Sequence, residues 1–365
     1  MLKVLIAPLD WGLGHATRCI PIIKGLLDQH CTVIIAADGA QKAALQKEFP
    51  DLSFVKTPGF RLKYGKNRAI TLLKIIFAIP KILIGIKREN RWLRHFARQE
   101  RLDLVISDCR YGLYGRGVVS VFMTHQLAIR SSFGGIVDVP LRWLNYRHIR
   151  RFSACWVPDV EGDDNLGGLL SHPSRMPEVP VRYIGWLSRM DKMEIPLEVD
   201  LLILLSGPEP QRTVLEELLL PQLGGMGSVI LVRGVPKGGS PLMTPGGVEV
   251  IDYLGARDLE RVIGQSRSVV ARSGYSTIMD LVKLGKTAIY VPTPGQPEQE
   301  YLGRYMEERG LGVCMRQRGF ILKRGLEKAA GLKNEPAMGE NTALVRVIGE
   351  VLAMARRQSA VADLG

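Results

Sequence analysis

A buried strand that leads straight into a glycine loop and a helix opens the chain, and this feature most constrains its fold. Residues 3–8 are almost entirely apolar, Gly12 and Gly14 lie within the loop 10–18, and residues 19–27 have the apolar pattern of a helix. A glycine turn between a strand and a helix N-terminus binds anions, because free backbone N–H groups and the positive end of the helix dipole point the same way. The opening therefore predicts an α/β fold with a ligand site at its first turn.

His15 stands at the start of this helix, where the positive helix end tends to keep an imidazole neutral. A neutral imidazole can accept a proton, so we predict that His15 acts as a general base. The alternative is a dinucleotide-binding turn, which requires a third glycine where this chain has Thr17, although Asp38 after the next strand is compatible with it. Because the glycine pattern is incomplete, we place a nicotinamide-dependent dehydrogenase last among the alternatives.

Strands and helices alternate through both halves of the chain. We expect strands at 33–37, 52–57, 102–108, 118–124 and 154–157, and then at 201–205, 228–232, 248–251, 268–271 and 287–291. Such alternation indicates parallel, doubly wound sheets, and 365 residues are too many for one ordinary core. We therefore predict two Rossmann-like domains that face each other across a cleft, at residues 1–185 and 201–341, joined by a linker at 186–200. A helical stretch in 342–365 is long enough to cross back to the first domain.

The net charge of +13 is concentrated in residues 61–101, which we call the basic segment. It holds 12 Lys and Arg against two Glu, and it contains an apolar run at 69–86. A spanning helix needs about 20 mostly apolar residues, and this run is shorter and is broken by Lys74, Pro80 and Lys81. We expect one or two helices that dip an apolar face into an anionic membrane surface. The predicted contact residues are Lys81, Lys87, Arg88, Arg91, Trp92 and Arg94.

The alternative for the basic segment is an ordinary helix that is buried against its sheet and has a solvated basic edge. Nucleic acid is disfavoured as a partner, because the segment has few aromatic residues for base stacking. Cys19, Cys31, Cys109, Cys155 and Cys314 are scattered and form no C-x-x-C pair, which indicates a reducing compartment and no structural zinc. Since the chain begins directly with a core strand, we expect no signal peptide and a cytoplasmic protein.

Two polar blocks follow strands of the second half. Residues 272–280 open a helix, and Asp280 falls about two turns into it, where a carboxylate can accept hydrogen bonds from two sugar hydroxyls. Residues 292–300 are dense in amide and carboxylate groups, which suits polyol recognition. The alternative for this second block is a surface loop stiffened by its prolines.

Taken together, five stretches resemble the MurG-like glycosyltransferases of family 28, which have the GT-B fold, and their diacylglycerol-glucosylating relatives. The stretches are 12–15, 206–212, 251–254, 272–280 and 292–300, and the resemblance is strongest from 206 to 304. It implies transfer of a sugar from a nucleoside diphosphate donor, which we expect to be a UDP-sugar, to a hydroxyl. It also implies a lipid acceptor and a peripheral position on the inner face of the cytoplasmic membrane.

The resemblance implies which residues bind each part of the donor. Along the chain these parts are the diphosphate, the uracil, the ribose and the sugar, in that order. The implied donor-site residues are Ser206, Gly207, Arg212, Ile251, Tyr253, Leu254, Arg272, Ser273, Gly274, Asp280, Gln299 and Glu300. Asp280 stands where the family usually has Glu, and Glu300 stands where the family has a second Gln. The family's His-Glu-Gln-Asn stretch falls on residues 124–127, with His125 in place of Glu.

For the reaction we expect His15 to take the acceptor proton, with Asp108 orienting it or acting in its place and His125 as third candidate. Gly12, Gly14 and Arg18 form the predicted acceptor loop. Backbone N–H groups and helix dipoles stabilise the leaving diphosphate, and no Asp-x-Asp pair stands between the sheets, so we predict no metal and no cofactor. The alternatives are a nucleotide-sugar 2-epimerase of the same fold and a non-catalytic nucleotide- or lipid-binding protein.

Overall fold

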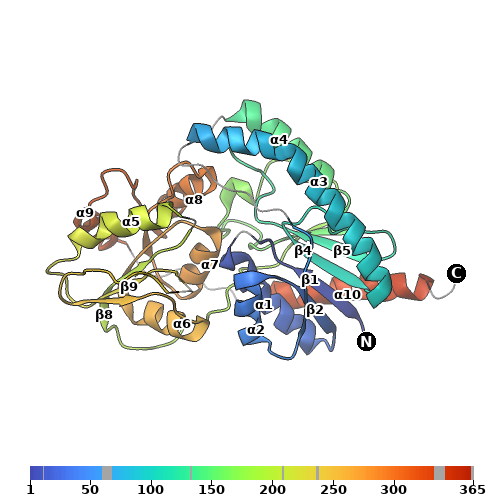
Figure 1. Cartoon of the computed structure of the whole chain (residues 1–365), viewed down its shortest axis with the longest axis horizontal. Helices are drawn as coiled ribbons and strands as arrows, with labels where there is room; N and C mark the ends of the chain where they lie inside the picture. Colours follow the sequence, from blue (N-terminus) through green and yellow to red (C-terminus); the bar gives the residue numbers. More distant parts are fainter. Residues whose placement is uncertain are drawn as a thin grey trace. The chain divides into compact units, whose positions relative to one another are not determined.

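The computed structural model describes residues 1–10, 12–59, 68–131, 134–207, 209–235, 238–332 and 342–362, with the side chains of 68–79 and 361–362 excepted. Residues 61–67 of the basic segment, and the side chains of its residues 68–79, therefore lie outside the described part. The chain divides into two compact units, an N-terminal unit of Met1–Leu187 with Glu340–Gly365 and a C-terminal unit of Ser188–Gly339. The two sheets are the two parallel, doubly wound sheets that the sequence predicts (Figure 1).

The N-terminal unit is built on a sheet with the strand order β3-β2-β1-β4-β5-β6-β7, and all neighbouring strands are parallel. Its strands are β1 (Lys3–Ala7), β2 (Thr32–Ala36), β3 (Ser53–Val55), β4 (Leu104–Asp108), β5 (Val119–Met123), β6 (Ala154–Val157) and β7 (Val181–Tyr183). Its helices are α1 (Leu13–Asp28), α2 (Gly39–Glu48), α3 (Arg68–Glu100), α4 (Gly135–Ile149) and α10 (Thr342–Ala362), with a short 3-10 turn at Gly168–Leu170. The chain reverses its direction of strand addition between β1 and β4, which is where such sheets bind ligands.

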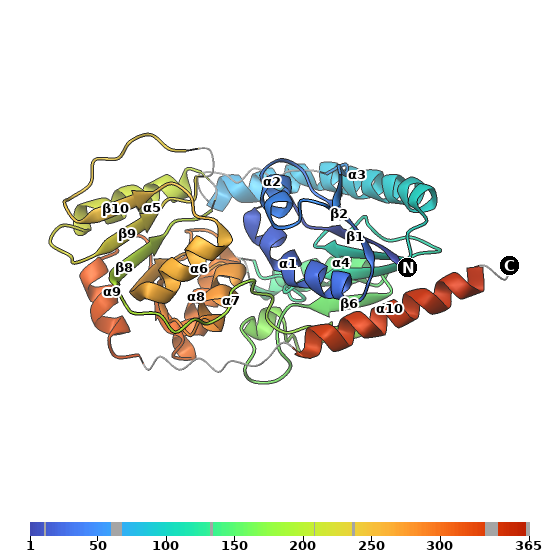
Figure 2. The ribbon, with the colours of Figure 1, turned by 90° about the horizontal axis from the view of Figure 1, so that it is seen from below.

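The helices of this unit cover opposite faces of the sheet. Side chains of α1 and α10, including Ile22, Ile23, Ile348 and Leu352, share one core with the inward residues of β1, β2, β4 and β5. On the other face α3 packs through Leu93 and α4 through Ile149. Figure 2 shows α3 and α10 on opposite sides of the strands. The last helix in the sequence therefore completes the core of the first unit.

The C-terminal unit repeats the plan with the strand order β10-β9-β8-β11-β12-β13, again all parallel. Its strands are β8 (Val199–Leu204), β9 (Val229–Val232), β10 (Val248–Ile251), β11 (Ser266–Ala271), β12 (Ala288–Tyr290) and β13 (Gly312–Cys314). Its helices are α5 (Gln211–Leu219), α6 (Ala256–Gln265), α7 (Tyr275–Lys283), α8 (Pro297–Glu308) and α9 (Leu322–Ala329), with a 3-10 turn at Leu220–Gln222. In this sheet the direction of strand addition reverses between β8 and β11.

The described part of the basic segment forms one helix, α3, which continues through Pro80. In its C-terminal half Ile86, Glu89 and Leu93 are buried, so this face belongs to the core of the unit. Glu89 accepts a hydrogen bond from the backbone N–H of Gly112 at 3.2 Å and pairs with Arg110 at 3.0 Å. In the described part of the chain, no helix is both long and apolar enough to cross a membrane.

Candidate active site

The first glycine loop stands at the reversal point of the N-terminal sheet. Gly12 precedes α1 with a φ of 155°, a backbone angle that side-chain-bearing residues rarely adopt. The side-chain amide of Gln41 donates to the backbone oxygens of Leu9 at 2.6 Å and of Gly12 at 2.7 Å, and this holds the loop to α2. Sequence reasoning missed Gln41. It lies 29 residues after Gly12, and no local pattern indicates that its side chain holds the loop in place.

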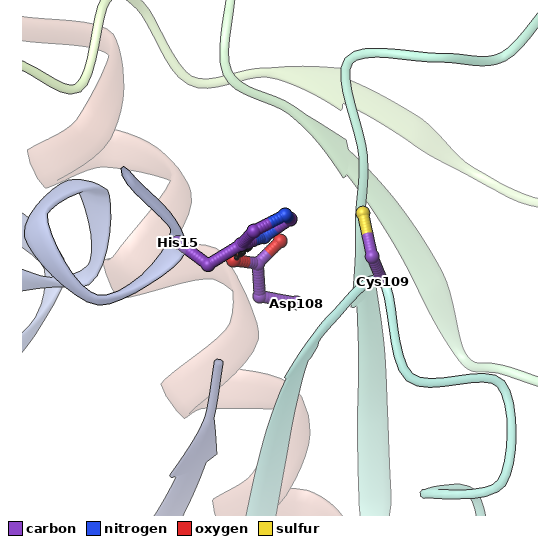
Figure 3. Close-up of side chains that lie close together, drawn as sticks. All are labelled: His15, Asp108 and Cys109. Atoms are coloured by element: carbon purple, nitrogen blue, oxygen red, sulfur yellow. Dashed lines mark hydrogen bonds and ion pairs between the residues drawn. The ribbon is translucent and has the colours of Figure 1, made fainter. Parts of the chain in front are cut away.

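His15 and Asp108 meet at this edge, as the sequence predicts for an oriented base. His15 projects from the first turn of α1, Asp108 ends β4, and His15 Nδ1 lies 2.8 Å from Asp108 Oδ2 (Figure 3). The Asp108 side chain is fully buried, whereas that of His15 keeps 20% of its surface exposed. A buried carboxylate therefore orients a histidine that is accessible to solvent.

Arg18 completes the group from one turn further along α1. Its Nε donates to Asp108 Oδ2 at 2.9 Å, and its Nη2 donates to Asp108 Oδ1. Nη2 also lies 2.8 Å from His15 Nδ1 and 3.5 Å from Cys109 Sγ. Because Asp108 Oδ1 and Cys109 Sγ can accept both hydrogens of Nη2, we assign the Nδ1 proton of His15 to its contact with Asp108. In that tautomer His15 Nε2 keeps a lone pair and can accept a proton.

The pKa shifts of His15 and Asp108 indicate which of the two groups is charged. Burial lowers the pKa of His15 below its ordinary value, Arg18 lowers it further, and Asp108 opposes the shift. Burial alone would raise the pKa of Asp108, but Arg18 and then His15 hold it well below its usual range. At neutral pH the group therefore consists of a neutral imidazole, a carboxylate and a guanidinium.

Arg18 has a different role from the one that the sequence suggests. We expected it in an acceptor-binding loop, but it is buried and its guanidinium binds Asp108. Arg18 Nη1 also donates to His125 Nδ1 at 3.2 Å. The side-chain amide nitrogen of Gln126 lies 3.4 Å from His125 Nε2, so both ring nitrogens of His125 have partners within the protein. The structure therefore favours His15 over His125 as the base.

His15, Asp108 and Cys109 offer ligand atoms within 4.8 Å of one another, an arrangement that also occurs in metal sites. The permanently charged guanidinium of Arg18 contacts all three residues. A divalent cation at this point would be repelled by that charge, so the group suits Arg18 better than a metal ion. Cys109 has a φ of 55°, which is strained for a residue with a side chain and turns the chain sharply after Asp108.

The reversal point of the C-terminal sheet carries the predicted donor turns. Ser206 and Gly207 follow β8 and are exposed, and Gly207 has a φ of 98°. Gly274 follows β11 and precedes α7. Both turns stand at the carboxyl ends of adjacent strands, which is where a diphosphate can meet backbone N–H groups.

Three predicted donor ligands instead hold these turns in place. Arg272 is buried and donates to the backbone oxygens of Gln211 at 2.7 Å and Val291 at 2.9 Å, so it links the turns after β8, β11 and β12. Ser273 is buried and donates to the backbone oxygen of Gln299 at 2.8 Å. Arg212 is paired with its own acidic neighbours, Glu209 at 2.6 Å and Glu216 at 3.0 Å. Their side chains are engaged within the protein, and their contact with the donor stays a prediction.

The remaining predicted donor residues lie at the same edge and are partly exposed. Ile251 ends β10, and Tyr253 and Leu254 follow it. Gln299 Oε1 accepts from the backbone N–H of Thr293 at 2.8 Å, and Glu300 Oε1 accepts from that of Gly295 at 3.0 Å. The pair thus shapes the loop before α8.

Asp280 lies on α7 and is partly exposed. Its Oδ1 accepts a hydrogen bond from the hydroxyl of Ser188 at 2.6 Å, a partner that sequence reasoning missed.

The predicted membrane residues divide into two groups. Lys81, Lys87, Arg88, Arg91 and Arg94 are exposed on α3, as the hypothesis requires. Trp92 is only partly exposed, packs against the core of the unit and stacks on Phe96 with ring centres 4.8 Å apart, so it suits membrane contact less well than the exposed cations.

Sequence reasoning also missed α4, whose exposed apolar residues recur at helical spacing. They are Ile136, Val139, Trp143 and Leu144, with exposed fractions of 90%, 55%, 63% and 41%.

Comparison with known proteins identifies the C-terminal unit. Residues 244–343 match the glycosyltransferase family 28 C-terminal domain. The C-terminal unit thus carries a family 28 glycosyltransferase domain, as the resemblance implies. The two Rossmann-like sheets confirm the predicted fold, whereas the roles of the single site residues stay predictions.

Two relatives show how far the likeness extends. The UDP-N-acetylglucosamine–N-acetylmuramyl-(pentapeptide) pyrophosphoryl-undecaprenol N-acetylglucosamine transferase of Desulforudis audaxviator is 31% identical over 128 residues, 34% of this chain and 33% of the relative. The chain thus spans about a third of that relative's length. An uncharacterized glycosyltransferase of Methanosarcina acetivorans is 25% identical over 330 residues, 85% of each chain. The solved structure of Acinetobacter baumannii MurG aligns with a TM-score of 0.53 at 13% identity, covering 98% of that chain and 99% of this one, which shows a shared fold.

Proposed function

We propose that this protein transfers a sugar from a UDP-sugar to a hydroxyl of a membrane lipid without a metal ion. One observation carries the proposal: a family 28 domain with two glycine turns accompanies a unit in which a buried carboxylate orients a neutral histidine. The Desulforudis relative is named for a UDP-sugar donor and an undecaprenol-linked acceptor, which supports the choice of donor and of acceptor class.

The residues of the chain account for each movement of protons and electrons. The acceptor oxygen forms a bond to the anomeric carbon of the sugar and gives its proton to His15 Nε2. The bond between that carbon and the diphosphate oxygen breaks, and its electron pair leaves with the nucleoside diphosphate. Asp108, whose Oδ2 is 2.8 Å from His15 Nδ1, stabilises the imidazolium that forms. Backbone N–H groups at 206–207 and the N-terminus of α7 stabilise the departing charge.

Metal independence is part of the proposal and rests on charge. The guanidinium of Arg18 already neutralises Asp108, and helix N-termini supply the positive potential that a metal would otherwise bring. We expect sugar transfer to persist in excess EDTA. A complete loss of transfer in EDTA that added Mg²⁺ restores would contradict this part of the proposal.

The donor is tested first. We expect the melting temperature of the protein to rise with UDP and not with GDP or ADP, because any ligand that binds only the folded state stabilises it. Product analysis with the donor alone separates a transferase from the 2-epimerase, since an epimerase converts the donor and a transferase at most hydrolyses it slowly. A clear shift with GDP or ADP and none with UDP would overturn the choice of uridine.

Membrane docking is supported by α3 and α4 together. Both helices pack on the same face of the sheet, since Val105 under α3 and Phe122 under α4 share a face by strand register. The exposed apolar residues are Leu83, Ile84, Ile136, Val139, Trp143 and Leu144. The guanidinium of Arg147 lies 5.5 Å from the centre of the Trp143 ring, so cationic and apolar groups alternate on α4 as they do on α3.

Sedimentation with vesicles tests the docking. We expect binding to vesicles with anionic lipid, and replacing Lys87, Arg88, Arg91 and Arg94 by Gln should weaken it by about a thousandfold, at roughly 1 kcal/mol for each charge. Replacing the exposed Lys323 and Arg324 of α9 is the matched control and should change binding far less. Indifference of the protein to anionic vesicles, or unchanged binding of the fourfold variant, would remove the membrane from the proposal.

A further inference from the structure

The carboxyl of Asp280 is held by a hydroxyl from outside its own helix. Ser188, the first residue of the C-terminal unit, donates from Oγ to Asp280 Oδ1 at 2.6 Å. The two residues are 92 positions apart in the sequence. Among the described residues, Ser188 is the hydrogen-bond donor that the structure records for Asp280, and it engages one of the two carboxylate oxygens. Oδ2 therefore remains to accept hydrogen bonds from a ligand.

The backbone that follows Ser188 fixes its hydroxyl in this position. The Ser188 Oγ also accepts a hydrogen bond from the backbone N–H of Met190 at 3.1 Å, and Met190 is buried. The next residue, Asp191, donates its backbone N–H to Glu260 of α6 at 2.5 Å. Since the hydroxyl donates one hydrogen bond and accepts another, its orientation is determined by the first turn of the predicted linker.

We propose that Ser188 is a positioning residue for donor recognition. Its hydroxyl holds the Asp280 carboxyl so that Oδ2 accepts hydrogen bonds from the ribose diol of the nucleotide. This inference rests on the proposed function, in which Asp280 binds the ribose. Asp280 is one methylene shorter than the Glu that the family usually has here, so a fixed orientation matters more than it would for a longer side chain. Holding the carboxyl in advance removes the entropy cost of ordering it when the donor binds.

The charges around Asp280 offer a readout that a merely structural role would not change. Burial raises the pKa of Asp280 to about 6, while the Ser188 hydrogen bond and Arg189 lower it and Glu260 of α6 raises it. Loss of the Ser188 hydroxyl should therefore move the pKa of Asp280 upward. Because the charged carboxylate is the better acceptor for a diol, UDP affinity should rise with pH through this range, and the rise should shift to higher pH in Ser188→Ala.

Titration calorimetry with UDP and 2′-deoxy-UDP tests the inference. We expect Ser188→Ala to weaken UDP by about tenfold and 2′-deoxy-UDP by less than about twofold, because the Ser188 hydroxyl acts through the contact of Asp280 to the ribose diol, which 2′-deoxy-UDP lacks. Ser188→Thr keeps the hydroxyl and should restore UDP affinity to within about threefold. Ser240→Ala, at an exposed position of the same unit, is the matched control and should leave both affinities unchanged.

The outcomes separate the inference from the function on which it rests. Equal weakening of both nucleotides by Ser188→Ala, or no weakening and no pH shift, overturns the role of Ser188 while leaving the donor assignment intact. If Asp280→Asn binds UDP and 2′-deoxy-UDP as the unchanged protein does, ribose recognition by Asp280 is wrong, and Ser188 with it. Failure of the unchanged protein to bind UDP overturns the proposed function itself. Melting curves of every variant show whether the fold is retained.

Discussion

Replacing Asp108 by Asn should destabilise the N-terminal unit more than any other single change at the candidate site. The Asp108 carboxyl is fully buried and accepts hydrogen bonds from Arg18 Nε at 2.9 Å, from Arg18 Nη2 and from His15 Nδ1 at 2.8 Å. Asparagine has nearly the same shape, but it removes the negative charge and turns one acceptor into a donor. Arg18 is then a buried cation without its counter-charge.

The expected magnitude follows from that unpaired charge. Removing one partner of a buried ion pair costs about 3–5 kcal/mol in the free energy of unfolding. For a unit of this size each kcal/mol lowers the melting temperature by about 2–4 °C, so we expect the transition of the N-terminal unit to fall by roughly 6–20 °C. Differential scanning calorimetry at pH 7 measures the shift, and Asp51→Asn at an exposed position should stay within about 0.5 kcal/mol.

A second variant tests the electrostatic reasoning directly. Arg18→Met combined with Asp108→Asn removes both charges, so the double variant should be more stable than Asp108→Asn alone. The dependence on pH has a definite sign. Because the pKa of Asp108 is depressed in the folded state, the stabilisation is complete above its unfolded value of about 3.9 and is lost as pH falls through the lower, folded value. A cost below about 1 kcal/mol for Asp108→Asn, or a double variant that is no more stable than the single one, would refute this account.

Three further predictions concern the chemistry and the loops. His15→Gln should lower kcat by about 10²–10⁴ and leave UDP affinity unchanged, as stopped assays and calorimetry can measure, and a loss below about tenfold would exclude His15 as the base. Because burial and then Arg18 lower the pKa of His15, the acid limb of the activity profile of the unchanged protein should lie below pH 6.5, and a limb above that value would contradict the assignment. Arg272→Met should leave the backbone oxygens of Gln211 and Val291 without their donor. It should lower the stability of the C-terminal unit by about 1–3 kcal/mol and weaken the binding of UDP. An unchanged melting curve would show that Arg272 does not hold the turns.

Much of the fold is predictable because its signals are local. An apolar run of five or six residues bounded by glycine or polar residues is enough to indicate a buried parallel strand. All eleven strands expected in the two halves, the opening strand included, begin within two residues of those observed. The sequence did not reveal the three-residue edge strands β7 and β13.

The candidate site is predictable only in part, for a physical reason. The sequence alone determined that glycine turns follow the first strand of each half and that His15 stands at a helix start, because helix dipoles and strand ends depend on neighbours in the chain. Only the tertiary structure decided that Arg18 is buried against Asp108, 90 residues away, and that Trp92 faces the core while Trp143 faces solvent. The local sequence shows whether a residue is apolar or charged. Which atoms it contacts depends on how strands and helices that are distant in sequence pack together. Gln41 and Ser188 act entirely through contacts with residues distant in sequence. For that reason no local sequence pattern reveals their roles.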